Sequence, residues 1–392
     1  MKKGWLIPVM AGMMTALSAA EYYVDFNRGS DGAAGSAATP LRSFDAAARK
    51  AKPGDTIRLV PSDQPIYTMV RTFKLKGTAD KPIVVDGSFN ILTGAARITS
   101  KEAEQVSPGL YRTTIKDPGE AMVWRFFLLF DGKQQRMEQH SKRQCGKLKK
   151  PEELKPFEWT LVNRTDLYFR LPEGKTPETV RVEMPRLANG VGVYEGSEHL
   201  VIKNFIATWF WNDGFNIHHA SKNIAFENIA AIGCGDDSVS AHDGCVITVK
   251  NLIAIGNGTG ICHAGTAEAD HENLYIADSD SRDFFVLNRR NSFRNVAVDA
   301  AAPIYSDVGD KGDAVLENLW FYSEKPGACF RTIRGGAITA KNVKLYNHTQ
   351  PGNTPGIEVV KDPAPIQAEI AKKKAELFAI FGGKLEKILA ER

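Results

Sequence analysis

An alternating apolar and polar pattern repeats along the middle of the chain. Short apolar runs such as Leu200–Ile202, Ile224–Phe226 and Val246–Val249 each lead to an Asn, which is followed by another apolar residue. The repeated residues are Asn204, Asn228, Asn251, Asn273, Asn295, Asn318 and Asn342. Their spacings are 24, 23, 22, 22, 23 and 24 residues, and so constant a period predicts a repeat architecture.

The period and the short apolar runs together indicate the kind of repeat. Such runs are too short for helices and suit strands, and three strands with their turns fill a coil of ~22–24 residues. An Asn at the same turn of every coil can donate its side-chain amide to the next coil, as in other stacked side-chain ladders. The sequence therefore predicts an all-β protein, a right-handed parallel β-helix, with its regular part at residues 186–350.

Residues outside this region are expected to cover or interrupt the stack, since open sheet edges need protection. In residues 21–96, the N-terminal cap and first coils, Ser43–Lys50 predicts a capping helix with Ser43 as N-cap. Residues 97–185 lack the Asn period and predict a small β-rich insert. Residues 351–392 predict a C-terminal helical cap or tail, with helical apolar spacing broken at Gly382–Gly383.

The first twenty residues have the pattern of a secretory signal peptide. Lys2 and Lys3 precede a short apolar run, and Ser18-Ala19-Ala20 places small residues before Glu21. We expect cleavage after Ala20 and a secreted or periplasmic protein. No later segment approaches the ~18 consecutive apolar residues that a membrane span needs.

Charge and cysteine content limit the function classes. The net charge of +4 on 392 residues gives no argument for nucleic-acid binding. Positive charge gathers at Lys133–Lys155, which is either a solvated loop or a landing surface for an acidic polysaccharide. The five cysteines lack a Cys-x-x-Cys pair, so we expect buried free thiols, with a disulfide among Cys234, Cys245 and Cys262 as the alternative. No glycine motif for nucleotides is present, and no organic cofactor is expected.

The opening of the mature sequence resembles that of exported pectate-lyase-like β-helix proteins. The matching segments are Tyr22-Tyr23-Val24-Asp25, Gly29-Ser30-Asp31-Gly32, Pro40-Leu41, Ser43-Phe44 and Pro53-Gly54-Asp55-Thr56-Ile57. Asp166–Pro172 resembles part of an insert found in polysaccharide-acting members. Over residues 21–350 the resemblance implies the β-helix fold, within a superfamily of hydrolases, lyases, esterases and adhesins.

A narrower resemblance lies inside the repeat. Asn212-Asp213-Gly214 resembles the Asn-Thr-Asp-Gly segment of polygalacturonase-type glycoside hydrolases, and Gly235-Asp236-Asp237-Ser238 resembles their Gly-Asp-Asp segment. Where that family has Gly-His-Gly, this chain has Gly258-Thr259-Gly260, and the later Arg-x-Lys has no clean counterpart. The resemblance implies carboxylate-assisted hydrolysis of glycosidic bonds.

Counting from the Asn repeat places the carboxylates together. Asp213 and Asp237 each follow their Asn by nine residues, so on coils ~4.8 Å apart they should be neighbours, with Asp236 beside them. A carboxyl group whose pKa is raised can protonate the leaving oxygen while another carboxylate activates water. We assign Asp237 as the acid and Asp213 and Asp236 as bases. Turn formation by Asp-Gly is the non-catalytic explanation for Asp213.

The same count predicts two outward columns of polar side chains. Asn216, Ser240 and His263 are expected in one column, and His218 and His242 in the next, which would join the carboxylates in one compact patch. Asn216 and His218 are candidate substrate-binding residues. His218 and His242 with Asp243 or Asp237 form a conceivable metal site.

A polysaccharide lyase acting on an acidic glycan by β-elimination is the alternative enzyme. Its base would be His242 or His263, and Ca²⁺ would be held by Asp236 and Asp237. The cationic residues on later coils that would neutralise a uronate carboxylate are Arg282, Arg289, Arg290 and Lys311.

Three aromatic residues precede the first carboxylate. If exposed, Trp209, Phe210 and Trp211 would stack on sugars, either in an enzyme subsite or in a non-catalytic glycan-binding or scaffold protein. Packing against the insert is the other explanation. Arg136, Glu138 and His140 follow the Asp131-Gly132 turn of the insert and could reach over the coils, but the sequence does not place them. The expected partner is a polysaccharide substrate, with a monomer as the default state.

Overall fold

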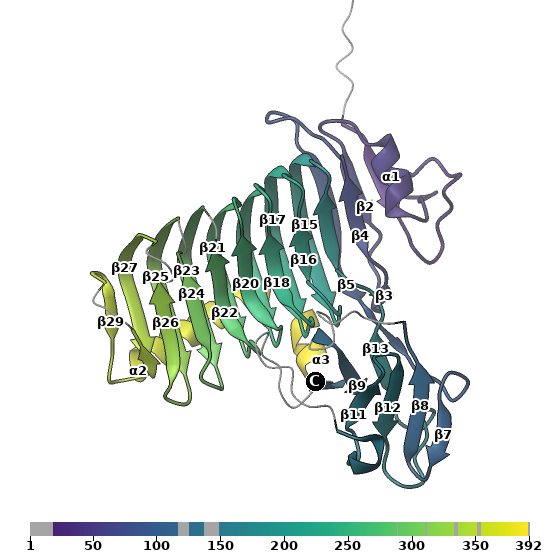
Figure 1. Cartoon of the computed structure of the whole chain (residues 1–392). Helices are drawn as coiled ribbons and strands as arrows, with labels where there is room; N and C mark the ends of the chain where they lie inside the picture. Colours follow the sequence, from purple (N-terminus) through teal and green to yellow (C-terminus); the bar gives the residue numbers. More distant parts are fainter. Residues whose placement is uncertain are drawn as a thin grey trace, which may run out of the picture.

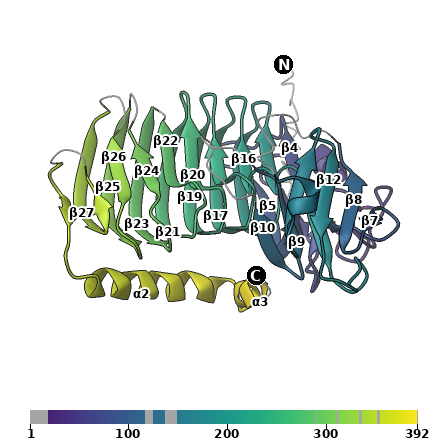
Figure 2. The same cartoon turned by 60° about the horizontal axis from the view of Figure 1, so that its bottom comes forward.

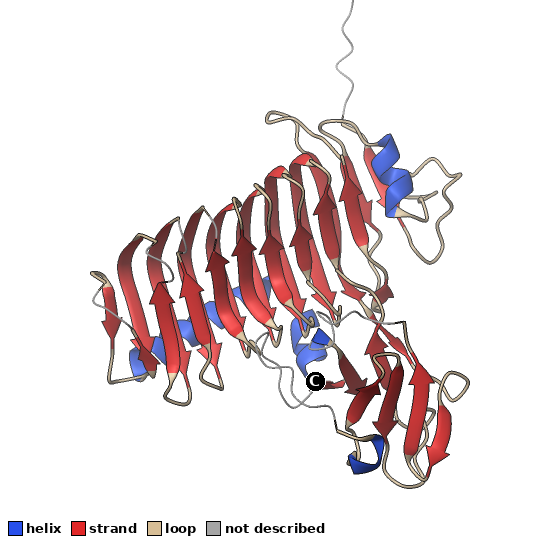
Figure 3. Cartoon of the chain, viewed as in Figure 1, coloured by secondary structure: helices blue, strands red, loops and turns tan. Residues whose placement is uncertain are grey.

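Two long parallel sheets wind into a solenoid (Figure 1). The structure, a computed structural model, describes residues 19–116, 125–136, 149–287, 289–309, 312–332, 336–350 and 354–390. Within these residues strands dominate; the α-helices lie near the two ends of the sequence, and one short 3-10 helix lies in the insert (Figure 3). The predicted parallel β-helix with its capping helix, β-rich insert and helical tail is confirmed.

In the part of the chain that the structure describes, sheet A has twelve strands and sheet B has nine. The strands of sheet A are β1 (Glu21–Val24), β2 (Thr56–Leu59), β3 (Ile66–Tyr67), β5 (Ile83–Thr93), β15 (Glu198–Thr208), β17 (Lys222–Ile232), β19 (Val246–Ile255), β21 (Glu268–Ala277), β23 (Arg290–Ala300), β25 (Asp313–Ser323), β27 (Ile338–Tyr346) and β29 (Ile357–Val359). Those of sheet B are β4 (Val70–Phe73), β14 (Val191–Tyr194), β16 (Phe215–Ile217), β18 (Asp237–Ala241), β20 (Thr259–Ala264), β22 (Arg282–Leu287), β24 (Tyr305–Val308), β26 (Ala328–Thr332) and β28 (His348–Thr349).

Each long strand of sheet A bends at its repeated Asn. These residues adopt positive φ, for example 60° at Asn204 and 58° at Asn251. The strand bends there without ending, so one continuous strand is found where two short strands were expected, one on either side of the Asn. Asn tolerates this conformation better than most residues because its short side chain bonds locally. The side-chain amides donate along the stack, with N···O distances of 3.0 Å from Asn228 to Asn204 and 2.8 Å from Asn251 to Asn228. The predicted ladder is therefore present.

The interior of the solenoid is filled by apolar side chains from both sheets. Alternation along sheet B places Phe215 and Ile217 inside, paired in register with Val239 and Ala241 on the next coil. Phe215 meets Phe226 of sheet A edge to face, with ring centroids 5.7 Å apart. Because each coil stacks the same positions, one apolar core runs the length of the solenoid.

The N-terminal end of the core is closed by helix α1 (Phe44–Lys50). The Ser43 hydroxyl accepts a hydrogen bond from the Ala46 amide at 3.2 Å, as an N-cap does, and Phe44 packs into the core. The predicted capping helix and its cap residue are confirmed.

The described residues of the β-rich insert form two four-stranded antiparallel sheets with their own apolar core, which includes Leu128, Trp159 and Phe169. One sheet contains β6 (Ala95–Arg97), β9 (Phe127–Phe130), β10 (Lys133–Arg136) and β13 (Val182–Pro185). The other contains β7 (Glu104–Ser107), β8 (Leu110–Thr114), β11 (Trp159–Val162) and β12 (Asp166–Arg170), and the short helix η2 (Pro151–Glu153) lies between β10 and β11 in sequence. The insert lies beside the N-terminal coils (Figure 1).

The C-terminal helices α2 (Ala364–Ile380) and α3 (Lys384–Ala390) run along the side of the stack rather than over its end (Figure 2). Leu377 and Phe378 pack on the apolar outer face of sheet A, where Ile232 and Ile253 are fully buried. The helices break at Gly382–Gly383, both with positive φ, as predicted.

Cys234, Cys245 and Cys262 are buried free thiols and Cys329 is a half-buried one, whereas Cys145 lies outside the described residues. The alternative disulfide is therefore not formed. Among the helices described here, none combines the length and hydrophobicity needed to span a membrane.

Candidate active site

Three aspartates from two successive coils meet at the leading edge of sheet B. Asp213 lies in the turn before β16, and Asp236 and Asp237 lie at the start of β18. Oxygen atoms of the three carboxyl groups lie within 4.8 Å of one another, and the residues are only 2–3% exposed. The predicted meeting of these carboxylates is confirmed, but they are buried rather than displayed on the surface.

Asp213 lies at the centre of a polar network. Its Oδ2 accepts hydrogen bonds from the Asn216 amide and from the Ser240 hydroxyl, the latter at 2.7 Å, and its Oδ1 accepts from the Asp237 backbone N–H at 3.1 Å. Burial raises the pKa of Asp213, and the neighbouring Asp237 carboxylate raises it further. This position therefore favours a protonated carboxyl group.

Arg125 of the insert joins this cluster, although nothing in the sequence pattern indicated it. Its guanidinium pairs with Asp236 Oδ2 and donates to Asn212 Oδ1. The backbones at Arg125 and Gly235 also pack closely against each other, because a Cβ atom added to Gly235 would lie 2.4 Å from the Arg125 carbonyl oxygen. In the sequence, Arg125 stands out only as a single Arg within an apolar run. An Arg at the end of a strand gives the same pattern, so the sequence does not indicate a contact with the aspartates. Pairing with Arg125 favours the ionised form of Asp236.

Thr259 takes the corresponding place on the third coil, paired in register with Asp237. Its side chain is fully buried, and its Oγ1 has no hydrogen-bond partner in the described part of the chain. A buried hydroxyl without a partner is unfavourable, so this position suits a bound water or ligand oxygen beside the carboxylates.

A cleft of about 530 Å³ lies between the solenoid and the insert, and residues adjacent in sequence to the cluster line it. On the solenoid side it is lined by Leu187 and Trp211, which directly precedes Asn212 and Asp213. On the insert side it is lined by Phe126, the neighbour of Arg125. Trp211 is half-buried and lines this cleft, and its contact with a substrate stays a prediction.

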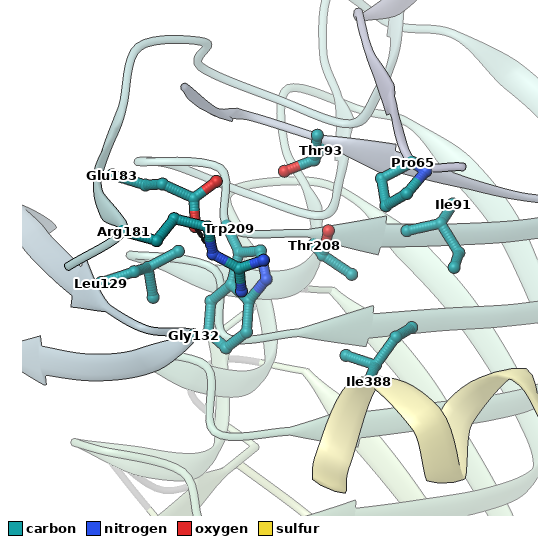
Figure 4. A pocket seen from close by; sticks show the side chains of 10 residues that line it. All are labelled: Pro65, Ile91, Thr93, Leu129, Gly132, Arg181, Glu183, Thr208, Trp209 and Ile388. Carbon is teal, nitrogen blue, oxygen red and sulfur yellow. Dashed lines mark ion pairs between the residues drawn. The ribbon is translucent and has the colours of Figure 1, made fainter. Parts of the chain in front are cut away.

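Trp209 and Phe210 depart from the expectation of exposed aromatic rings. Phe210 is fully buried in the core. Trp209 packs on Phe127 of the insert, with ring centroids 6.3 Å apart, and leaves no room for a Cβ on Gly233. It also lines a separate pocket of about 110 Å³, where sheet A, the insert and Ile388 of α3 meet (Figure 4). For Trp209, packing against the insert is therefore the better explanation.

His218 and His242 do form one column, with parallel rings 4.5 Å apart, and His218 Nδ1 lies 3.1 Å from Asp243 Oδ2. The expectation that they join the carboxylates in one patch is wrong. Asp237 begins β18 and His242 follows its end, so five residue steps separate them by roughly 16 Å. The three aspartates are also the one group of at least three candidate metal ligands found among the described residues, so the His218–His242 metal site is not supported.

The outward direction predicted for His263 is wrong. His263 pairs in register with Ala241, and Cys262 takes the column of Asn216 and Ser240. Thr259 follows Asn251 by eight residues, whereas its partner Asp237 follows Asn228 by nine. Counting from Asn251 therefore assigns the side chains of β20 to the wrong face of the sheet. His263 is consequently fully buried, with its Nε2 2.9 Å from His271 Nε2, and no geometry supports a catalytic role for it.

The cationic candidates differ in exposure. Arg282 is 4% exposed and its Nε donates to Asp307 Oδ2 at 2.7 Å, so its charge is already paired. Arg289 is exposed on the turn after β22. Arg136 does reach the coils and donates to the Cys234 carbonyl at 2.7 Å. Glu138, His140 and Lys311 lie outside the described residues.

No protein-family model and no curated protein matches the sequence. Solved structures with similar architecture include a glycoside hydrolase, which is 9% identical over 86% of this chain and 96% of that chain, with a TM-score of 0.49. XylC in complex with xylose is 13% identical over 84% and 75% of the two chains, with a TM-score of 0.45. Pectate lyase Pel9A is 12% identical over 88% and 79%, with a TM-score of 0.40.

With identities and TM-scores this low, the chemistry of this chain must be derived from its own side chains. Its strand pairing alone defines the architecture, because successive coils pair in parallel along both sheets. The chain has a parallel β-helix fold.

Proposed function

We propose that this chain is an exported carbohydrate-active enzyme that hydrolyses glycosidic bonds of a polysaccharide at Asp213, Asp236 and Asp237. The observation that carries the proposal is the meeting of three buried carboxyl groups, one of which, Asp213, lies two residues after Trp211 in the wall of the cleft. Support for export comes from the sequence pattern that ends at Ala20, most of which lies outside the described residues.

The proposed reaction divides acid and base roles between differently placed carboxyl groups. The raised pKa of Asp213 favours a proton on the Asp213/Asp237 pair, and this pair protonates the leaving glycosidic oxygen. Asp236, ionised beside Arg125, accepts the proton of the attacking water. This changes the role first assigned to Asp213, which was that of a base.

The arrangement suits this chemistry because the three environments differ. Three carboxylates this close cannot all be ionised without large repulsion, and one guanidinium offsets only part of it. Burial excludes water and strengthens these differences. The cleft would hold the sugar chain against Trp211, so that the scissile bond lies near Thr259 and the carboxylates.

A Ca²⁺-dependent polysaccharide lyase is the second candidate, favoured by the same oxygen cluster. Carboxylate oxygens are the ligands that Ca²⁺ prefers, and Asp213, Asp236 and Asp237 would hold the ion. Bound there, Ca²⁺ would supply positive charge to neutralise a uronate carboxylate. His242 lies too far from the cluster to be the base of such a reaction at the same site.

A panel digest separates the two candidates. The purified protein is incubated with neutral and acidic polysaccharides, with and without EDTA, and is assayed for reducing ends and for the absorbance of unsaturated products. The proposal predicts reducing ends without unsaturated products, and no effect of EDTA. Unsaturated products that EDTA abolishes would establish the lyase instead. A panel left intact would contradict both enzymes and favour a glycan-binding scaffold.

A further inference from the structure

The row of side chains that begins at Asp237 continues along sheet B beyond the carboxylates. Asp237 pairs in register with Thr259, Thr259 with Arg282, and Arg282 with Tyr305. Thr259 and Arg282 are buried, whereas Tyr305 is 44% exposed. Among the described residues of this row, Tyr305 is thus the first exposed side chain on the C-terminal side of the site. Three coil steps place it ~14 Å from Asp237.

Next to Tyr305 lies an unusual group of charges around Asp307. Asp307 is fully buried, and it accepts hydrogen bonds from Arg282 Nε at 2.7 Å and from Arg331 Nε at 2.5 Å. One carboxylate is therefore shared by two guanidinium groups. Among these three described groups, the carboxylate offsets only one guanidinium, so one positive charge is left over.

The two guanidinium groups are held rigidly against aromatic rings. The central carbon of the Arg282 guanidinium lies 4.6 Å from the centroid of Phe285, and that of Arg331 lies 4.9 Å from the centroid of Tyr305. The Arg331 side chain remains 29% exposed, whereas that of Arg282 is 5% exposed. Arg331 is therefore the cation that an approaching ligand can contact, and Asp307 and Tyr305 fix its position in advance.

We infer that Tyr305 and Arg331 form a distal subsite for an anionic sugar residue of the polysaccharide chain. The phenol ring offers an apolar edge and a hydroxyl to the sugar, and the guanidinium pairs with its carboxylate or sulfate. The subsite rests on the proposed function, because it would bind the same chain that the carboxylates cleave. The coil spacing is close to the length of one sugar residue, so the anionic residue lies about three sugars from the scissile bond.

The subsite and the cleft lie on opposite sides of the carboxylates along the solenoid. The cleft is lined by residues that precede β4, β14 and β16, such as Met69, Leu187 and Trp211. Tyr305 and Arg331 belong to β24 and β26, farther along the same sheet. A polysaccharide lying parallel to the solenoid axis would therefore contact both while it passes the carboxylates.

Direct binding tests the subsite without depending on turnover. Calorimetry on the Asp237→Asn chain uses hexamers of polygalacturonate and of alginate, and the same hexamers with their carboxyl groups reduced to alcohols. We expect Arg331→Gln to weaken binding of a uronate hexamer roughly tenfold or more. Tyr305→Ala, which removes an exposed side chain, should weaken it as well. Arg294→Gln, which removes an equal charge from sheet A, should leave it unchanged. The reduced hexamers should not respond to Arg331→Gln.

The outcomes separate the subsite from the proposed hydrolysis. Equal binding by the Arg331→Gln and Arg294→Gln variants, with Tyr305→Ala also unchanged, would overturn the subsite. Cleavage of the hexamer by the unmodified chain without dependence on Arg331 would overturn the subsite alone. Binding that depends on Arg331, without cleavage, would overturn hydrolysis alone. Neither binding nor cleavage of any hexamer would count against both.

Discussion

Arg125 is the residue that most directly controls charge in the carboxylate cluster. It pairs with Asp236, and its positive charge also lowers the pKa of Asp213 against the effect of burial. Its removal should therefore make the carboxyl groups hold their protons more tightly.

Arg125→Gln should shift the pH profile of kcat/KM upward by about one unit. Without the guanidinium the pKa of Asp213 is no longer lowered, and Asp236 loses the cation that pairs with it. Arg112→Gln is the matched control, because Arg112 pairs with Asp166 inside the insert, away from the cluster. A profile that stays in place for Arg125→Gln would show that this ion pair serves packing alone.

The buried pair of His263 and His271 makes stability depend on pH. His271 Nδ1 lies 3.1 Å from the Ser292 carbonyl oxygen, and burial lowers the pKa of His271 to about 4 from its ordinary value of 6.5. Above pH 6.5 the ring is neutral in both the folded and the unfolded chain, so its full contribution is present.

Between pH 6.5 and about 4 the unfolded chain binds a proton that the folded chain does not. The free energy of unfolding should therefore fall by about 3 kcal/mol across this range on account of His271. Urea unfolding at several pH values measures this. His271→Gln should flatten the dependence, whereas replacement of the exposed His219 by Gln should not. Equal slopes in both variants would disprove the assignment.

At the scale of elements, the Asn ladder holds the bends of sheet A in register. Asn251 donates to Asn228 and accepts from Asn273, at 2.8 and 2.7 Å, in a backbone conformation with positive φ. Asn251→Gly keeps the conformation and removes both hydrogen bonds, so it should cost roughly 1–3 kcal/mol of unfolding free energy. Asn251→Ala should cost about 1 kcal/mol more, because Ala resists this conformation.

Asn223 supplies the control for the ladder in the same unfolding measurement. It also has positive φ, 55°, but within the described structure the one hydrogen-bond contact of its side chain is with His199, at 3.4 Å and on the surface. Asn223→Gly should therefore leave stability nearly unchanged. If Asn223→Gly and Asn251→Gly were equally harmless, the ladder would be a consequence of the fold without a measurable contribution to it.

Helix α2 is held by its apolar face rather than by the end of the solenoid. Leu377 is fully buried against sheet A, whereas Lys372 on the same helix is exposed. Leu377→Ala should lower the unfolding free energy by about 2–5 kcal/mol, and Lys372→Ala should have little effect. Thermal unfolding of both variants measures this, and equal melting temperatures would mean that α2 is only loosely attached.

At the scale of the whole molecule, the fold could be predicted from the sequence because every coil needs the same residue types at the same positions. One Asn per coil, which the structure shows at positive φ, and one apolar row per strand can be counted along the chain. The same count predicts that Asp213 and Asp237 are neighbours. Register beyond Asn251 could not be counted, because a turn shortened by one residue leaves no mark in the apolar pattern. For this reason the sequence predicted that the His263 side chain points outward, whereas in the structure it is buried.

The contacts of the insert were the other feature that could not be predicted from the sequence. Arg125 reaches Asp236 from more than a hundred residues away, and no local pattern encodes such a contact. Trp209 and Trp211 look equivalent in sequence, yet they line different cavities because the insert occupies one side of the coil. Contacts between the insert and the solenoid therefore required the structure.

The most direct measurement compares two Asp→Asn variants on a polysaccharide that the unmodified chain cleaves. Asp283 is a fully buried aspartate outside the cluster, and burial raises its pKa to about 7, so an amide there should be tolerated. We predict that Asp237→Asn lowers the release of reducing ends at least about a hundredfold while Asp283→Asn retains it. Full activity of a folded Asp237→Asn chain would contradict hydrolysis at this carboxylate cluster.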